Sequence, residues 1–117
     1  MRASVGGLTR RPQFLRVAAK GRKSVTPGLI LQVCRQPAGA EALNVGFTAS
    51  RRVGGAVQRN RARRRLRAAV AAVMPHHAKQ GHDYVVIART ETLRRPFGAL
   101  VHDLETALRR LDVWRES

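Results

Sequence analysis

Arginine side chains dominate one short stretch of this chain. Eight of residues 51–67 are arginine, and none is acidic. Apolar residues recur at helical spacing through this stretch and beyond it: Ala62, Leu66, Ala69, Val70 and Val73. The pattern predicts a helix with one face in a core and the other face covered with guanidinium groups. A dense array of guanidinium groups is suited to a polyanion, whose phosphate oxygens accept paired hydrogen bonds.

A solvated charged face is the usual fate of a charge run, and the sequence argues against it here. Like charges three or four residues apart on a helix repel each other by roughly a few tenths of a kcal/mol per pair. No acidic residue interrupts residues 56–74 to relieve that repulsion. The phosphates of a bound nucleic acid would neutralise it, so we expect such a partner.

The Gly54-Gly55 pair before the predicted helix has two interpretations. It relieves backbone strain at a sharp turn, or it brings free backbone N–H groups and the positive helix end close to a phosphate. No Gly-Lys-Ser or Gly-Lys-Thr sequence follows, so the pair is not part of a Walker phosphate loop.

Groups that could carry catalysis are scarce. His76, His77, His82 and His102 have no metal-ligating companions at a suitable spacing. Cys34 lies in an apolar run and is expected to be a buried core residue. Aromatic residues are few, and no RNP-type motif of a single-strand-binding domain is present. We therefore expect no catalytic residue and no metal site on the polypeptide.

The overall charge supports a nucleic-acid partner. The net charge is +16, and twenty of the 23 basic residues are arginine. Residues 1–82 carry 17 basic residues and one acidic residue, a net of +16, whereas residues 83–117 carry six of each, a net of zero. The partner should therefore bind mainly to the first two thirds of the chain.

The length of 117 residues and the 44% apolar content fit one folded domain over 1–117, with residues 1–10 expected to be poorly ordered. No apolar run is long enough to span a membrane, and the N-terminal residues lack the apolar part of a secretion signal. We expect a cytoplasmic location.

The hydrophobic periodicity predicts an α+β domain with a small sheet of three to four strands and about three helices. Residues 22–28 fit a loop or a short edge strand, and Pro75 is expected to end the second helix. A stripe from Phe97 to Leu111 is expected to bury the third helix. The predicted helices cover 12–20, 56–73 and 96–111, and the predicted strands cover 29–34, 43–50 and 84–88.

The segment 45–67, Val-Gly-Phe-Thr-Ala-Ser-Arg-Arg-Val-Gly-Gly-Ala-Val-Gln-Arg-Asn-Arg-Ala-Arg-Arg-Arg-Leu-Arg, resembles the signature of the bacterial ribonuclease P protein subunit. That signature is a strand ending in Ser and two basic residues, a short Gly/Ala turn, and Arg-Asn-Arg opening a basic helix. Looser matches extend the resemblance over nearly the whole chain: residues 8–14 and Val17 resemble the family's N-terminal helix, and residues 83–89 its last strand.

The resemblance implies an α/β sandwich with a mixed sheet and a left-handed strand–helix–strand crossover, against the general right-handed rule. It also implies a function: the protein subunit of a ribonucleoprotein that removes the 5′ leader from precursor tRNA. The partners would be the ribonuclease P RNA subunit, with one protein copy per RNA, and precursor tRNA. Catalytic Mg²⁺ ions would be held by the RNA subunit and the substrate, not by the protein.

The resemblance also implies two sets of contact residues. Contacts to the RNA subunit carry over to Arg51, Arg52, Arg59, Asn60, Arg61, Arg63, Arg64 and Arg67. A cleft between the N-terminal helix and an exposed sheet face would hold the leader, lined by Phe14, Arg16, Val17, Ala18, Lys20, Ile30 and Gln32. Ala18 and Gln32 stand where the family often has aromatic residues, so leader contacts are expected either to be weaker or to rest more on Arg16, Lys20 and the backbone.

Two other functions remain open from the sequence. A structural RNA-binding protein, such as a ribosomal protein, has a similar charge and size. A DNA-binding module would place the basic helix in the major groove, but no dimerisation element or helix-turn-helix spacing supports it.

Overall fold

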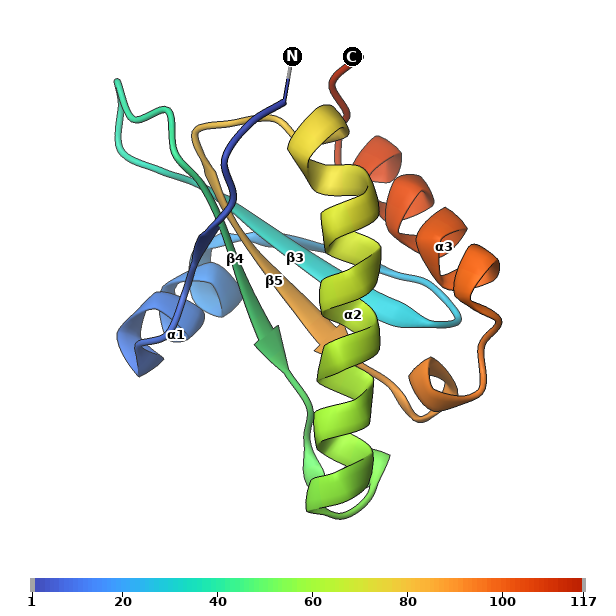
Figure 1. Ribbon diagram of the computed structural model, residues 1–117. Helices are drawn as coiled ribbons and strands as arrows, with labels where there is room; N and C mark the ends of the chain where they lie inside the picture. Colours follow the sequence, from blue (N-terminus) through green and yellow to red (C-terminus); the bar gives the residue numbers. More distant parts are fainter. Residues whose placement is uncertain (1, 117) are drawn as a thin grey trace.

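A computed structural model describes residues 2–116, so residues 1 and 117 of the predicted domain lie outside the described residues. The described residues form five strands and three α-helices, with short 3-10 helices η1 and η2 in the connections (Figure 1). In chain order they are β1 (Gly6–Gly7), α1 (Arg11–Lys20), β2 (Arg22–Val25), β3 (Leu29–Arg35), β4 (Leu43–Thr48), η1 (Arg51–Val53), α2 (Ala56–His77), β5 (His82–Ala88), η2 (Thr90–Leu93) and α3 (Phe97–Arg110).

The sheet is mixed, with strand order β1-β4-β5-β3-β2. β4 is parallel to β1 and to β5, whereas β3 is antiparallel to β5 and to β2. The α+β class is confirmed, but the sheet has five strands where three to four were predicted. The added strand β1 is a glycine pair, whose backbone pairs with β4 and whose missing side chains leave no period-two signal.

The chain leaves β4, returns through α2 and enters β5 beside and parallel to β4. With α2 toward the viewer and both strands running down, β5 lies to the right of β4 (Figure 1). This arrangement is a left-handed crossover, as the resemblance implied. It opposes the right-handed rule that holds for nearly all such units.

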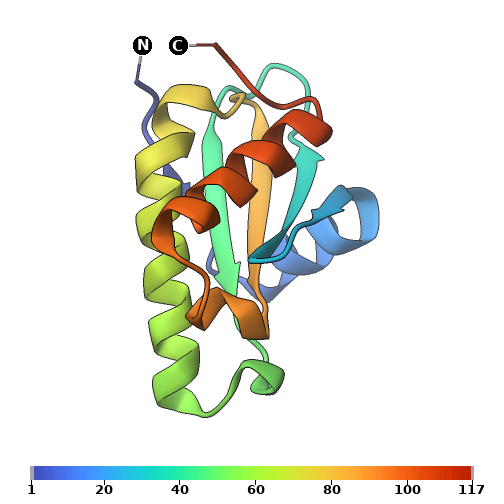
Figure 2. The same ribbon diagram turned by 90° about the vertical axis from the view of Figure 1, so that its right-hand side faces the viewer.

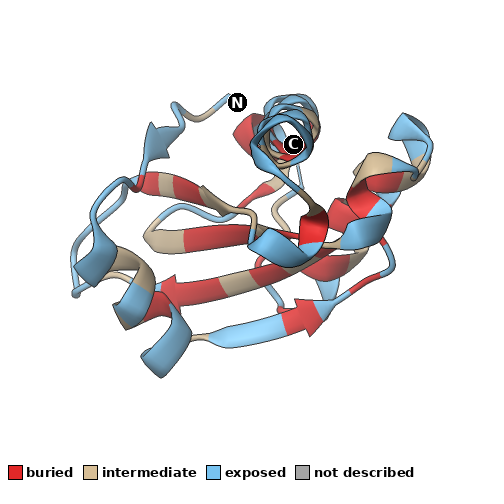
Figure 3. Ribbon diagram, turned by 90° about the horizontal axis from the view of Figure 1, so that it is seen from below, coloured by how far each residue is buried: buried red, intermediate tan, exposed pale blue. Residues whose placement is uncertain are grey.

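The main core lies between the sheet and the pair α2 and α3. Alternate β3 residues Leu29, Leu31 and Val33 point into it, and Leu66 and Leu104 meet them from the two helices. Figure 2 shows α2 and α3 on one side of the sheet and α1 on the other. Buried residues gather along the strands and on the helix sides that face them (Figure 3).

A second, smaller core lies beneath α1 on the opposite sheet face. It contains Leu8, Val17, Cys34 and Val85, so Cys34 is buried as expected. Because this cluster is small, α1 covers only part of its face, and Ile30 farther along β3 stays half-buried.

Two predicted helix features are wrong. Pro75 does not end α2, which continues to His77. A proline lacks the N–H that would bond the carbonyl four residues earlier. That residue is Ala71, which is exposed, so water can replace the missing donor. Phe97 is the first residue of α3 and 44% exposed, so the buried stripe begins at Leu100.

The sequence predicted poor order over residues 1–10. In the described part, the backbone N–H of Ala3 donates to the carbonyl of Pro75 at 2.7 Å, and that of Leu8 donates to the carbonyl of Val45 at 3.1 Å. These bonds, together with β1, place the segment along β4 and the C-terminal half of α2. Within residues 2–116, none of the helices combines the length and apolar character needed to cross a membrane.

Candidate nucleic-acid interface

The arginine-rich segment begins with a tight turn between β4 and α2. The Ser50 hydroxyl accepts a hydrogen bond from the backbone N–H of Arg52 at 3.3 Å and caps η1. Gly54 follows with a φ of 143°, a conformation that L side chains rarely adopt. Gly55 is extended and caps α2. Gly54 therefore has a backbone role that favours glycine, whereas the conformation of Gly55 is open to any residue.

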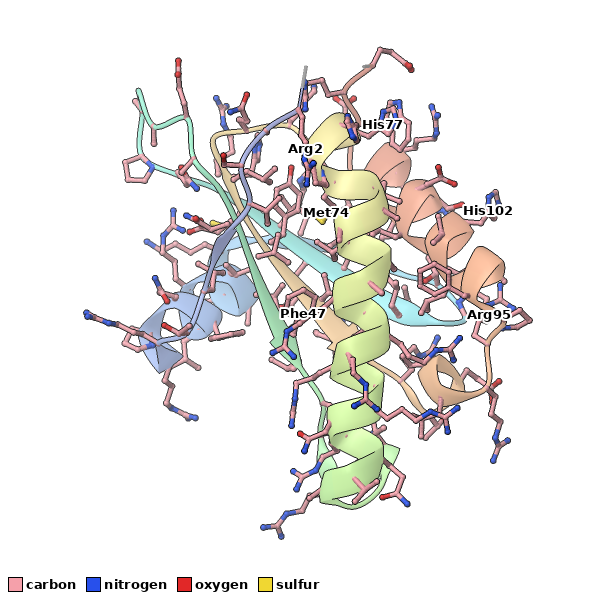
Figure 4. All side chains as sticks on the ribbon, in the orientation of Figure 1. Arg2, Phe47, Met74, His77, Arg95 and His102 are labelled. Atoms are coloured by element: carbon pink, nitrogen blue, oxygen red, sulfur yellow. The ribbon has the colours of Figure 1, made fainter. Side chains whose placement is uncertain are left out.

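Seven arginines from η1 and the N-terminal half of α2 form what we call the arginine surface: Arg51, Arg52, Arg59, Arg61, Arg63, Arg64 and Arg67. Arg59 and Arg63 are half-buried, and the other five are exposed. Nitrogen-tipped side chains radiate from this half of α2 (Figure 4). None of the ion pairs found within residues 2–116 engages any of the seven.

Three members of the surface have distinct surroundings: two are held by contacts, and one has a buried donor without an acceptor. Arg63 donates from Nη2 to the Asn60 side-chain oxygen at 2.7 Å. The Arg67 guanidinium lies 5.3 Å from the ring centroid of Phe47, which projects from β4 toward α2 (Figure 4). The Nε of Arg59 is buried and finds no hydrogen-bond acceptor within the described chain.

Arg65 belongs to the same run but has a different role. Its Nη1 donates to the carbonyl of Thr92 at 2.6 Å, and its Nη2 donates to the carbonyl of Arg95. Both carbonyls lie at the η2 connection between β5 and α3. Arg65 therefore holds the fold together, and it is not among the residues predicted to contact RNA.

The predicted leader cleft corresponds only partly to the structure. Phe14 packs over Gly46 of β4, where an added Cβ would lie 2.6 Å from two ring atoms. Phe14 also lines a hollow of about 480 Å³ beside the end of β4, together with Thr48 and Arg63. Because Arg63 belongs to the arginine surface, this hollow and that surface are continuous.

Other predicted cleft residues lie elsewhere. Val17 is 1% exposed and packs in the smaller core, so its prediction as a cleft contact is wrong. Ile30 and Gln32 are half-buried on the same sheet face, but on β3, with β5 between them and β4. Ala18 is exposed on α1.

Arg16 and Lys20 lie on the opposite flank of α1 from Phe14. Residues two apart on a helix differ by roughly 200° in direction. Arg16 donates from Nη1 to an Asp83 carboxylate oxygen at 3.2 Å, and Lys20 lines the same separate hollow as Arg16. The prediction that these two cations share the cleft with Phe14 is not supported.

The sequence reasoning missed Phe47 and Thr48 as surface components. Phe47 fits a core face by its spacing, and it does pack against the main core, yet it also carries the Arg67 guanidinium. The chain turns from β4 into η1 and so exposes the end of β4 beside Phe14. This three-dimensional arrangement, and not the sequence spacing, places Phe47 at the surface as well as in the core.

The carboxylates of the described residues do not form a metal site. No group of three or more His, Cys, Asp or Glu side chains within residues 2–116 is placed to hold an ion. Asp83 accepts hydrogen bonds from Arg16, Gln36 and Asn44. The buried Asp103 accepts two from Arg95 and one from the backbone N–H of Gly28.

Comparison with known proteins identifies the family. Residues 5–112 match the family model described as Ribonuclease P. A ribonuclease P protein component of Paramagnetospirillum magneticum is 55% identical over 116 residues, which cover 95% of this chain and 86% of that protein. A ribonuclease P protein component of Ruegeria pomeroyi is 44% identical over 111 residues, covering 93% and 88%.

Solved structures show the same fold. The Staphylococcus aureus RNase P protein matches with a TM-score of 0.77 at 22% identity, covering 93% of this chain and 97% of that chain. The RNase P protein from Thermotoga maritima matches with a TM-score of 0.75 at 24% identity, covering 88% and 94%. The chain belongs to the ribonuclease P protein family.

Proposed function

We propose that this chain is the protein subunit of ribonuclease P, one copy per RNA subunit, acting in the cytoplasm on precursor tRNA. The arginine surface binds the RNA subunit, and the hollow beside Phe14 receives the 5′ leader. The protein assists endonucleolytic removal of the leader, and the RNA subunit carries the bond cleavage. Membership of the family and the relatives named as ribonuclease P protein components support this assignment.

The observation that carries the proposal is the unpaired arginine surface. Seven guanidinium groups crowd one turn and one helix face with no carboxylate partner among the described residues. Each contact with a phosphate releases condensed counterions, so such a surface gains its affinity from a polyanion and loses it in salt. Five of the seven are exposed and ready for contact.

Arg59 adds a local reason for a ligand at this surface. A buried donor without an acceptor costs about 1–3 kcal/mol, and the Nε of Arg59 is in that position. Swinging outward to a phosphate oxygen gives the guanidinium its acceptors. RNA binding would thereby relieve a cost that the free protein carries.

The continuity through Arg63 supports a joint site for the two RNAs. The leader in the hollow beside Phe14 and the RNA subunit on α2 would meet at this side chain. The Phe14 ring offers a face for stacking with an unpaired base, the usual way in which single-stranded RNA is recognised.

Magnesium belongs in this proposal to the RNA subunit and the substrate. The described residues offer no cluster of ligands for it. The protein's own contribution is positive charge, which offsets the repulsion between phosphates of the RNA subunit and the substrate. Less Mg²⁺ should then be needed for productive binding.

The test is cleavage of precursor tRNA by the RNA subunit, with and without the protein, across a magnesium titration. The protein alone should cut nothing, and adding it to the RNA should allow cleavage at lower magnesium. An Arg61→Ala/Arg64→Ala variant should need more magnesium than wild type, with Arg94→Ala as a control that removes an exposed charge elsewhere. No stimulation by wild-type protein at any magnesium concentration would reject the proposal.

A further inference from the structure

A second basic concavity lies away from the arginine surface. It is a hollow of about 740 Å³ lined by six basic side chains, which we call the basic hollow: Arg16, Lys20, Arg22, Arg35, Lys79 and His82. They come from α1, β2, β3, the connection after α2, and β5. Its size falls within the range of roughly 300–1,000 Å³ that is usual for ligand sites.

The charge of the basic hollow is strongly one-sided. Five permanent cations, the arginines and lysines, face two nearby carboxylates, Asp112 in the lining and Asp83 beside Arg16, which leaves a net charge of +3. The lining also includes Val33 and Val113, whose nearly fully buried side chains belong to the main core behind the hollow. Low-dielectric walls around cations of one sign focus the potential and attract anions.

Two of these guanidinium groups are held in place by backbone carbonyls. Arg22 donates from Nη2 to the carbonyl of Leu111 at 2.7 Å. Arg16 donates from Nη2 to the carbonyl of Arg35 and from Nη1 to Asp83. Fixed donors lose little conformational entropy when they bind a phosphate, which distinguishes the hollow from a face of freely moving solvated charges.

Three cationic side chains of the hollow have no partner within the described chain. The side chains of Lys20, Arg35 and Lys79 are exposed and make no hydrogen bond or ion pair there. Together with the fixed pair, they surround the hollow from several directions. This arrangement suits the phosphates of a flexible polyanionic strand, which can bend into a concavity.

The position of the basic hollow indicates which part of an RNA ligand could reach it. It lies where β3 ends and β5 begins, whereas the arginine surface starts beyond the other end of the sheet, where β4 ends (Figure 1). Between them lies α1, with Phe14 on the flank toward the end of β4 and Arg16 and Lys20 on the flank toward the hollow. A single-stranded RNA that passes Phe14 and crosses α1 therefore enters the basic hollow.

We propose that the basic hollow binds the phosphates of the upstream part of a precursor-tRNA leader, beyond the nucleotides held beside Phe14. This inference rests on the proposed function and adds a distal subsite to it. Long leaders gain affinity from the hollow, and short leaders do not reach it. Arg16 and Lys20 thus contact RNA in the basic hollow and not in the cleft that the family resemblance implied.

The test compares two precursor tRNAs, one with a short leader and one with a long unstructured leader, binding to the assembled holoenzyme. Arg35→Ala and Lys79→Ala are made singly and together. Arg94→Ala is the matched control, because Arg94 is exposed and lies outside the hollow. Lys79→Arg keeps the charge and should bind as wild type does. Unchanged melting temperatures will show that the variants fold.

The double variant should weaken binding of the long-leader precursor several-fold and leave short-leader binding unchanged. The slope of log K against log salt should fall by about 0.7 for each phosphate that is no longer bound, the value for single strands. Equal weakening for both leaders, or none for either, would overturn the distal subsite while the proposed function stands. A wild-type holoenzyme without protein-dependent binding of either precursor would overturn the proposed function and this inference together.

Discussion

The guanidinium of Arg65 donates a 2.6 Å hydrogen bond to the backbone carbonyl of Thr92, 27 residues along the chain. Its neighbour Arg64 is exposed and makes no such bond within residues 2–116. Two adjacent arginines in one basic run thus have different roles, one within the fold and one toward a partner. The difference can be measured.

Arg65→Ala should destabilise the domain, because the carbonyls of Thr92 and Arg95 both lose a charged donor. Hydrogen bonds to charged groups contribute about 1.5–3 kcal/mol, so the free energy of unfolding should drop by about that amount in urea titration. Arg64→Ala should leave it unchanged within about 0.5 kcal/mol. Equal stabilities of the two variants would show that the Arg65 hydrogen bonds are not structural.

Arg61→Ala and Arg64→Ala should each weaken binding to the RNA subunit and flatten its salt dependence. The slope of log K against log salt should fall by about 0.7–0.9 for each phosphate group that the variant no longer binds. The binding constants are measured by fluorescence titration at several salt concentrations, with Arg94→Ala as the control. A variant with the wild-type slope identifies an arginine that does not touch phosphate.

Gly46→Ala should displace Phe14 and thereby weaken leader binding. The new Cβ would lie 2.6 Å from two Phe14 ring atoms and 3.0 Å from the Cβ of Leu8, so the ring must move. Such overpacking costs about 1–3 kcal/mol. Gly7→Ala is the control, since its Cβ meets nothing within 4 Å. Both variants are compared by melting temperature and by affinity for precursor relative to mature tRNA.

For Gly46→Ala, a selective loss of precursor affinity is the expected result. If the ratio of precursor to mature tRNA affinity stays at the wild-type value while the Phe14 packing is disturbed, Phe14 takes no part in leader binding. The control guards against a general effect of replacing glycine in a strand.

Tyr84 should make stability fall at high pH. Burial raises the pKa of its hydroxyl above the usual value near 10, and that hydroxyl donates to the carbonyl of Lys79 at 2.6 Å. Because the folded state holds its proton more tightly, the stabilising effect is complete below about pH 10 and is lost as the pH rises toward the folded pKa. Urea midpoints above pH 10 should decline.

The chain has one tyrosine, so tyrosinate absorbance follows this group alone. Native protein should begin to absorb as tyrosinate only at a higher pH than unfolded protein does. In Tyr84→Phe the part of the decline due to this hydroxyl should disappear. Titration of native Tyr84 near pH 10 would contradict the assigned burial effect.

The local hydrophobic pattern was enough to predict the main helices and strands, but not the edge strand β1. Strand β3 and helices α1 and α3 lie within one or two residues of the predicted ranges, because their apolar residues keep a regular period. β1 escaped prediction because two glycines have no side chains to form a pattern. The left-handed crossover was expected only from the family resemblance, since no residue pattern encodes the hand.

The site was predicted with similar limits. The exposed arginines of α2, Arg61, Arg64 and Arg67, follow from helical spacing, since they lie away from the Leu66 stripe. Arg51 and Arg52 lie in η1 and were expected only from the family resemblance. The prediction of the cleft residues failed where the direction of a side chain decides whether it lines the cleft. Val17 turns into the core, and Arg16 and Lys20 turn away from Phe14, so helix α1 separates residues that the family resemblance had grouped. Helical spacing alone puts Arg16 about 200° from Phe14, but which side of α1 packs on the sheet depends on tertiary contacts that one sequence does not specify.

The most direct test of the central claim is the identity and activity of the RNA that co-purifies with the native protein. We predict one structured transcript that cleaves precursor tRNA at its 5′ end and does so at lower magnesium when the protein is present. Recovery of ribosomal RNA in stoichiometric amount, or cleavage by the polypeptide after complete removal of RNA, would contradict it.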